Sequence, residues 1–133
     1  MHWIENSQWL IWMCLITEFA TVIPVSQNHQ GPYFTEEPPS HVDYQNTLGT
    51  VIHCAAGGTP IPSIKWTKQD GSDIVDVAGL RQSRSDGSLV FPPFRAQDYK
   101  QEVSSTSYRC VASNAVGSIV SRDVQVRAGE SSD

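Results

Sequence analysis

Two cysteines, a tryptophan and a tyrosine constrain the fold of this chain more than any other feature. Trp66 follows Cys54, and Tyr108 comes two positions before Cys110. This order is typical of a two-sheet antiparallel sandwich, in which a disulfide joins the sheets, the tryptophan packs on it and the tyrosine hydroxyl fixes a turn. We therefore predict an all-β fold with a Cys54–Cys110 disulfide.

Residues around these anchors alternate between inward and outward positions, which predicts short, half-buried strands. In the first strand Ile52, Cys54 and Ala56 share one face, and the stretches around Trp66 and Cys110 repeat the pattern. Because each of these strands contributes apolar groups to one interior, the three stretches predict a single core. Besides the two cysteines, the predicted core residues are Ile52, Ile64, Trp66, Leu89, Phe91, Tyr108 and Ala112.

The N-terminal part of the chain indicates export. An apolar run from Trp9 to Ile16 contains Cys14, is too short to span a bilayer comfortably, and lies where a secretory signal would be. We predict a signal peptide over residues 1–26, although the pattern does not fix its cleavage site. The alternatives are a signal anchor or a misassigned start of the chain. A core disulfide requires an oxidising compartment, so an extracellular location is favoured whichever of these possibilities holds.

Prolines delimit the first strands. An edge strand beginning near Gly31 is expected to end at the Pro38-Pro39 pair, since proline cannot donate to a ladder. Residues 40–44 then continue along the second sheet. After a turn at residues 46–49, the first cysteine strand is expected to begin at Thr50.

Glycine-containing turns delimit the remaining strands. Asp-Gly pairs at residues 70–71 and 86–87 are strong turn signals. The last hairpin is expected at residues 114–117, where we predict positive φ for Asn and Gly. The final strand then runs to about Ala128.

Charge and composition argue against several classes of function. The net charge is only -5, and all nine Lys and Arg residues lie at or beyond Lys65, scattered singly among acids. Since nucleic-acid surfaces need basic patches, we predict no nucleic-acid partner. Serines and histidines lack a recognisable catalytic setting, so we predict no enzymatic activity, no small-molecule substrate and no cofactor.

Two histidines are candidate metal ligands. His41 and His53 lie on neighbouring predicted strands, but no third ligand recurs at suitable spacing, so both are expected to face solvent. No Asn-x-Ser/Thr acceptor occurs, so N-glycosylation is not expected to cover either sheet. Both faces are therefore expected to be available to protein partners.

Two longer motifs carry a family resemblance. The pattern G-x-P-x-P-x-I-x-W ends at Trp66, and the pattern Y-x-C-x-A-x-N-x-x-G begins at Tyr108. Together they resemble the I-set branch of the immunoglobulin superfamily. The resemblance implies an immunoglobulin-like I-set domain over residues 31–128, followed by a short tail at 129–133.

One departure from the I-set pattern affects a corner of the predicted domain. Ordinary I-set domains place an acidic residue four positions before the corner tyrosine, whereas Asp98 lies ten before Tyr108. The extra residues, at about 100–105, are expected to enlarge the corner between the fifth and sixth strands.

The segments 79–82 and 86–99, with this long corner, resemble the first immunoglobulin domain of the Down syndrome cell adhesion molecule (Dscam) family. The resemblance implies a cell-surface receptor with homophilic adhesion in axon guidance and dendrite self-avoidance. It also implies that this domain helps to hold the receptor's N-terminal shape. Because the chain stops at Asp133, we expect an N-terminal fragment or a truncated isoform.

Some alternatives stay open at this point. A secreted immune-type recognition protein that binds foreign surfaces would use the same fold. Tyr99 and the Pro-Pro-Phe turn at residues 92–94 would form a partner-binding knob, but we favour Phe94 closing the lower end of the core. Arg81 and Asp98 are candidates for an ion pair across the lower edge.

Overall fold

Short strands and two single helical turns follow one another in this computed structural model, which describes residues 28–129. The predicted signal peptide and residues 130–133 lie outside the described residues. The strands and turns are β1 (Gln30–Glu36), β2 (His41–Gln45), β3 (Thr50–Ile52), β4 (Ala55–Thr59), β5 (Ser63–Lys68), β6 (Gln82–Ser83), β7 (Leu89–Phe91), η1 (Ala96–Asp98), α2 (Gln101–Ser104), β8 (Ser105–Ser113), β9 (Ser118–Val120) and β10 (Val124–Gly129).

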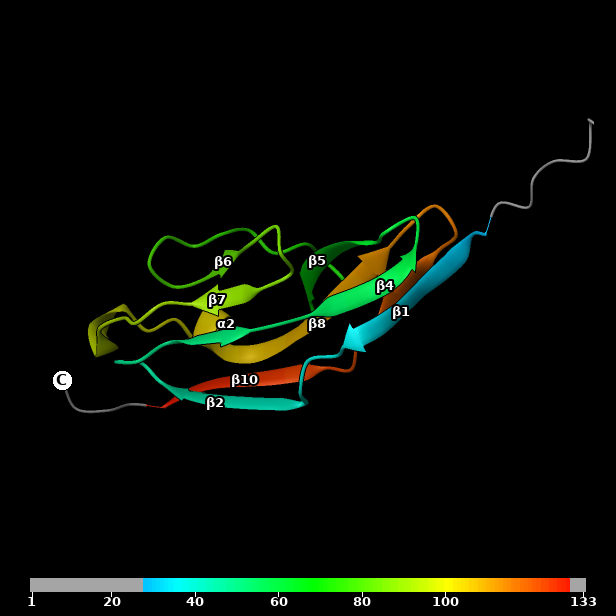
Figure 1. Ribbon diagram of the computed structural model, residues 1–133. Helices are drawn as coiled ribbons and strands as arrows, with labels where there is room; N and C mark the ends of the chain where they lie inside the picture. The colour runs from blue at the N-terminus through cyan, green and yellow to red at the C-terminus, as the bar shows by residue number, and fades with distance from the viewer. Residues whose placement is uncertain (1–27, 130–133) are drawn as a thin grey trace, which may run out of the picture.

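The strands form two layers, which confirms the predicted all-β sandwich (Figure 1). One layer has the order β2-β10-β8-β5, with β9 also paired to β8. The other contains β3-β7-β6, and the β1–β4 ladder extends it because β4 continues the chain from β3. β2 pairs in parallel with β10, whereas the other ladders are antiparallel. The final strand includes Gly129, which the sequence had assigned to the tail.

The alternation pattern predicts a continuous first cysteine strand, but the structure divides this strand in two. It divides at residues 53–54, because β3 pairs with β7 while β4 pairs with β1. The turn before β7 lies close against this break. Gly87 in that turn has φ +94°, and a Cβ there would collide with the Cys54 carbonyl oxygen. Only glycine fits such a close approach at positive φ.

The last hairpin forms at the predicted residues but by a different device. Asn114 N donates to the Gly117 carbonyl over 2.9 Å, yet no described non-glycine residue has positive φ, and Gly117 does not adopt it either. Instead, the Asn114 side-chain oxygen accepts from Val116 N at 2.9 Å and from Gly117 N at 3.3 Å. The prediction of positive φ was therefore wrong, because a side chain closes the turn.

The core lies between the layers and surrounds a disulfide. Cys54 and Cys110 are bonded with their Cα atoms 6.6 Å apart. Trp66 is 2% exposed, and its Nε1 donates to the Gly87 carbonyl at 2.9 Å. Ile64, a predicted core residue, is only half-buried and packs against the edge of this cluster. The other predicted core residues are all buried: Ile52, Leu89, Phe91, Tyr108 and Ala112.

Candidate protein-binding surfaces

The lower corner of the sandwich is built around Tyr108. Its hydroxyl donates to the Val103 carbonyl at 2.7 Å and accepts from Arg81 Nη1 at 3.0 Å. Burial raises the pKa of Tyr108, although the Arg81 hydrogen bond opposes the shift. Val103 belongs to α2, within the extra residues that the sequence placed at this corner. The enlarged corner is therefore a helical turn tied to the tyrosine.

Arg81 does not pair with Asp98, which corrects the expectation from sequence. Arg81 is 4% exposed and its Nη2 donates to the Val75 carbonyl at 2.6 Å. Asp98 lies in the surface turn η1 and pairs with Arg95 at 3.2 Å. The extra residues separate Asp98 from the corner tyrosine, so its carboxylate lies away from the buried guanidinium.

A surface hollow opens beside this corner. It has a volume of about 620 Å³, and its lining includes Leu80, Phe94, Tyr99 and Lys100. Phe94 is half-buried and packs against the core, as favoured from sequence. Tyr99 is 40% exposed and its hydroxyl donates to Ser105 Oγ at 2.9 Å. Tyr99 is thus the aromatic side chain that this corner offers to solvent.

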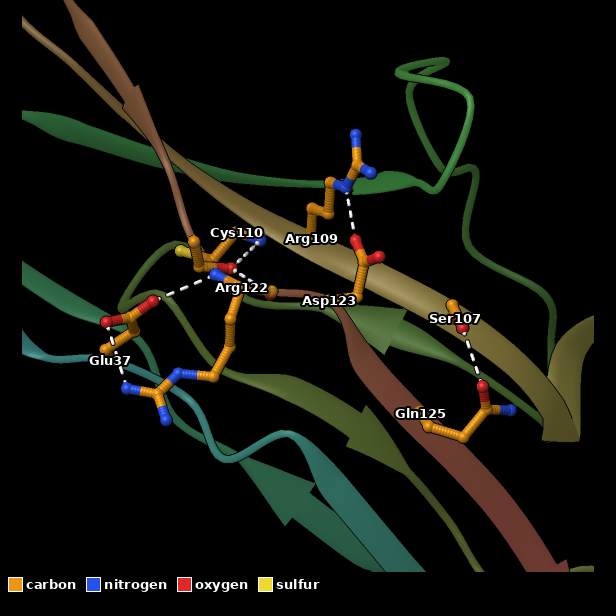
Figure 2. A network of polar contacts seen from close by, with 8 residues as sticks. Glu37, Ser107, Arg109, Cys110, Arg122, Asp123 and Gln125 are labelled. Carbon is orange, nitrogen blue, oxygen red and sulfur yellow. Dashed lines mark hydrogen bonds and ion pairs between the residues drawn. The ribbon is translucent and has the colours of Figure 1, made fainter.

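The outer face of the β5-β8-β10 sheet carries paired polar side chains. Figure 2 shows Arg109 bound to Asp123, and Ser107 Oγ donating to Gln125 Oε1 at 2.9 Å. The Arg109 hydrogen bond lowers the pKa of Asp123. Lys65 pairs with Asp73 at 3.0 Å beside them. Since exposed ion pairs contribute little to stability, this pattern is better suited to orienting a partner than to holding the fold.

Glu37 and Arg122 form an ion pair that we call the clamp. It joins the segment where the chain passes from β1 to β2 to the gap between β9 and β10. Glu37 accepts from Arg122 N at 2.8 Å and from Arg122 Nη2 at 3.1 Å (Figure 2). These bonds lower the pKa of Glu37. In the same gap, Ser121 Oγ accepts from Cys110 N at 2.9 Å. The final strand, predicted as continuous, is interrupted at residues 121–123, where the Ser121 hydroxyl takes the hydrogen bond of the Cys110 N–H.

The opposite end of the domain is an uncharged tip, made by residues 30–31, 60–62 and 114–117. Asn114 Nδ2 holds it together by donating to the carbonyls of Gln30 at 2.8 Å and Pro60 at 2.9 Å. Ile61 is 88% exposed and Val116 is 53% exposed. Neither this tip nor the Glu37 clamp can be recognised in the sequence, since the residues that meet in each of them are far apart along the chain.

The two histidines lie apart from each other. His41 is exposed on β2, whereas His53 lies in the gap between β3 and β4, with Nδ1 3.1 Å from Ser88 Oγ. Within residues 28–129, no three His, Cys, Asp or Glu side chains gather where they could hold a metal ion. In the same residues, no helix has the length and apolar character needed to cross a bilayer.

Disulfide, buried tryptophan and tyrosine corner together define an immunoglobulin-like domain. The family model described as Immunoglobulin I-set domain matches residues 32–127, so the chain belongs to the I-set family. Among relatives, it is 45% identical over 130 residues to the cell adhesion molecule Dscam1 of Drosophila melanogaster and 31% identical over 120 residues to human DSCAM. These alignments cover 93% and 90% of this chain but only 6% of each relative.

Solved structures show the same relationship to Dscam1. The N-terminal four Ig domains of Dscam1 isoform 7.44 match with a TM-score of 0.77 and 50% identity, over 80% of this chain and 27% of that one. Isoform 9.44 matches with a TM-score of 0.78. This chain is therefore an immunoglobulin domain homologous to those of Dscam cell adhesion molecules.

Proposed function

We propose that this chain is an extracellular binding domain of a cell-adhesion receptor and that it takes part in homophilic recognition between cells. The observation that carries the proposal is its 45% identity to the cell adhesion molecule Dscam1 over nearly the whole chain. Its partners are other immunoglobulin domains, including the same receptor on a second cell. Axon guidance and dendrite self-avoidance are the settings in which we place it, through its likeness to the Dscam family.

Two surfaces of the domain suit protein partners. The paired charges beside Arg109 favour a partner with a matching pattern, because electrostatic complementarity contributes mainly to specificity and orientation. The tip around Ile61 and Val116 offers apolar area without charges to desolvate. A binding role without catalysis is consistent with both surfaces.

The location proposed for this domain is outside the cell. The Cys54–Cys110 disulfide persists in oxidising compartments and is rare in the cytosol. Cell-surface display as part of a receptor follows from the same family likeness. A secreted domain would meet the same redox requirement.

A bead-aggregation assay tests the proposal. The exported chain is attached by one terminus to beads of two colours, and self-recognition is expected to produce mixed clusters that soluble chain inhibits. Beads carrying the reduced, alkylated chain are the control. Absence of clustering together with tight binding to microbial surfaces would contradict adhesion.

That result would favour a second candidate, a secreted immune-type recognition protein. The exposed loop residues of the tip, Ile61 above all, are the observation that favours it, since such loops can bind foreign surfaces. Binding to microbial surfaces should then fall when Ile61→Ser is introduced.

A further inference from the structure

The charged residues of this chain avoid the end of the domain that carries the tip. No Asp, Glu, Lys, Arg or His occurs in residues 30–35, 54–64 or 110–121, although the whole chain has nine basic and 14 acidic residues. These three segments meet there, since β1, β4 and the hairpin after β8 reach the same end, away from the C-terminus (Figure 1). The net charge of -5 therefore lies elsewhere in the chain.

Two aliphatic side chains protrude from this charge-free end. Ile61 is 88% exposed, more than any other large hydrophobic residue of the part that the structure describes, and Val116 on the neighbouring loop is 53% exposed. The exposed residues around them include Pro60, Ala115 and Gly117, which carry no polar side chain. The tip therefore offers apolar groups from two loops at once.

Several backbone polar groups of the tip are already satisfied within it. Pro60 and Pro62 have no N–H to leave unpaired. The Asn114 side chain donates to the carbonyls of Gln30 and Pro60 at 2.8 and 2.9 Å. Its oxygen accepts from Val116 N at 2.9 Å. Because an unpaired polar group is costly in an apolar phase, this pairing lowers the cost of moving the tip out of water.

The tip suits a lipid surface better than a protein pocket. A stable protein contact buries about 800 Å² on each partner and is usually anchored by aromatic or Arg side chains. Two loop ends with one aliphatic residue each provide little of either. A lipid surface needs no complementary shape, and apolar side chains can enter its boundary from any direction. The acidic remainder of the chain favours neutral headgroups over anionic ones.

We propose that the tip inserts into a membrane surface with zwitterionic headgroups, with Ile61 and Val116 at the boundary between headgroups and acyl chains. Tyr33 lies on β1 near the tip and is 48% exposed, and its amphipathic ring suits the headgroup level. Two such side chains bury less apolar area than a myristoyl chain, whose binding is itself marginal. Insertion is therefore weak for one domain and depends on many copies acting together.

Vesicle capture tests the insertion. Beads carry the exported chain attached by its C-terminus, which leaves the tip free, and are mixed with fluorescent phosphatidylcholine vesicles. We expect capture that I61S lowers by about fivefold or more and that I61S/V116S abolishes. The matched control is L48S, because Leu48 is 71% exposed but lies in the turn between β2 and β3, outside the tip. It should capture as many vesicles as the unmodified chain.

Fluorescence reports the depth of the same contact. In I61W the new indole should be quenched by vesicles with brominated acyl chains, whereas the indole of L48W should not be. Adding phosphatidylserine should not increase capture, and high salt should not decrease it, because no charge takes part. Capture that requires phosphatidylserine, or that salt abolishes, would overturn the insertion.

The outcome of vesicle capture is independent of homophilic recognition, since it needs no contact between two chains. Capture without bead clustering would support the insertion and count against homophilic adhesion. No capture, or equal capture by the I61S/V116S variant, would overturn the insertion. If the same variant instead lost bead clustering, the tip would be a protein contact and adhesion would stand. Intact mass after alkylation checks that each variant retains the Cys54–Cys110 bond.

Discussion

The centre of the sandwich and its β1 margin are held by different forces. At the centre, Trp66 is 2% exposed beside a covalent bond, and the rings of Phe91 and Tyr108 lie 5.6 Å apart. At the margin, Glu37 and Arg122 form an ion pair with each other, and their side chains are 31% and 54% exposed. Water screens the second kind of contact but not the first. The centre therefore determines whether the domain folds, and the margin determines how firmly one strand stays on it.

The largest expected effect is at the centre. Trp66→Ala should lower the free energy of unfolding by about 3–5 kcal/mol, because it leaves a cavity beside the disulfide and removes the hydrogen bond to Gly87. Urea unfolding of the disulfide-bonded chain measures it. Val120→Ala, at an exposed position, is the control and should change stability by about 0.5 kcal/mol or less. A loss no greater than that of the control would show that the centre does not determine the stability of the domain.

A smaller effect is expected at the tyrosine corner. Tyr108→Phe leaves the Val103 carbonyl and Arg81 Nη1 without their hydroxyl partner, so stability should fall by about 1–3 kcal/mol. Tyr33→Phe, on a half-exposed ring, provides the matched control. Equal stability of the two variants would show that the corner is not held by this hydroxyl.

At the tip the expected change is about 1 kcal/mol. Asn114→Ala removes the side-chain bonds to the carbonyls of Gln30 and Pro60, but water can replace part of them. Hydrogen exchange should show faster exchange in β1 while β7, at the centre, keeps its protection. Uniform acceleration in both strands would contradict the separation of margin and centre.

The smallest effect is the acid response of the clamp. Arg122 lowers the pKa of Glu37 below its ordinary value of 4.5 in the folded protein. The clamp's contribution is thus present above that value and is lost as the pH falls through the lowered folded pKa. Unfolding measured for wild type and Glu37→Gln should differ slightly at neutral pH and converge at acid pH. A difference that grows towards acid pH would contradict this sign.

The same contrast explains what sequence could predict. Alternation around Cys54, Trp66 and Cys110 is a local signal, so the sandwich and its disulfide follow from it. Glu37 and Arg122 lie 85 residues apart, and no local pattern relates them. Asn114 was assigned to the right turn but with the wrong backbone, because its side-chain bonds depend on the folded hairpin.

The hydrogen-bond partners of Arg81 could not be predicted from the sequence. Its expected partner Asp98 is displaced by the helical turn α2, and the guanidinium instead contacts Tyr108 and a backbone carbonyl. The length of the corner was visible in the sequence. Its folded path, which decides the partner, depends on packing against the tyrosine and was not visible.

Disulfide mapping of the exported, unreduced chain shows whether Cys54 and Cys110 join the two layers. Mass spectrometry after proteolysis should find the peptide containing Cys54 linked to the peptide containing Cys110. Free thiols at both positions, or a link from either one to Cys14, would contradict a sandwich whose two layers are joined at its centre.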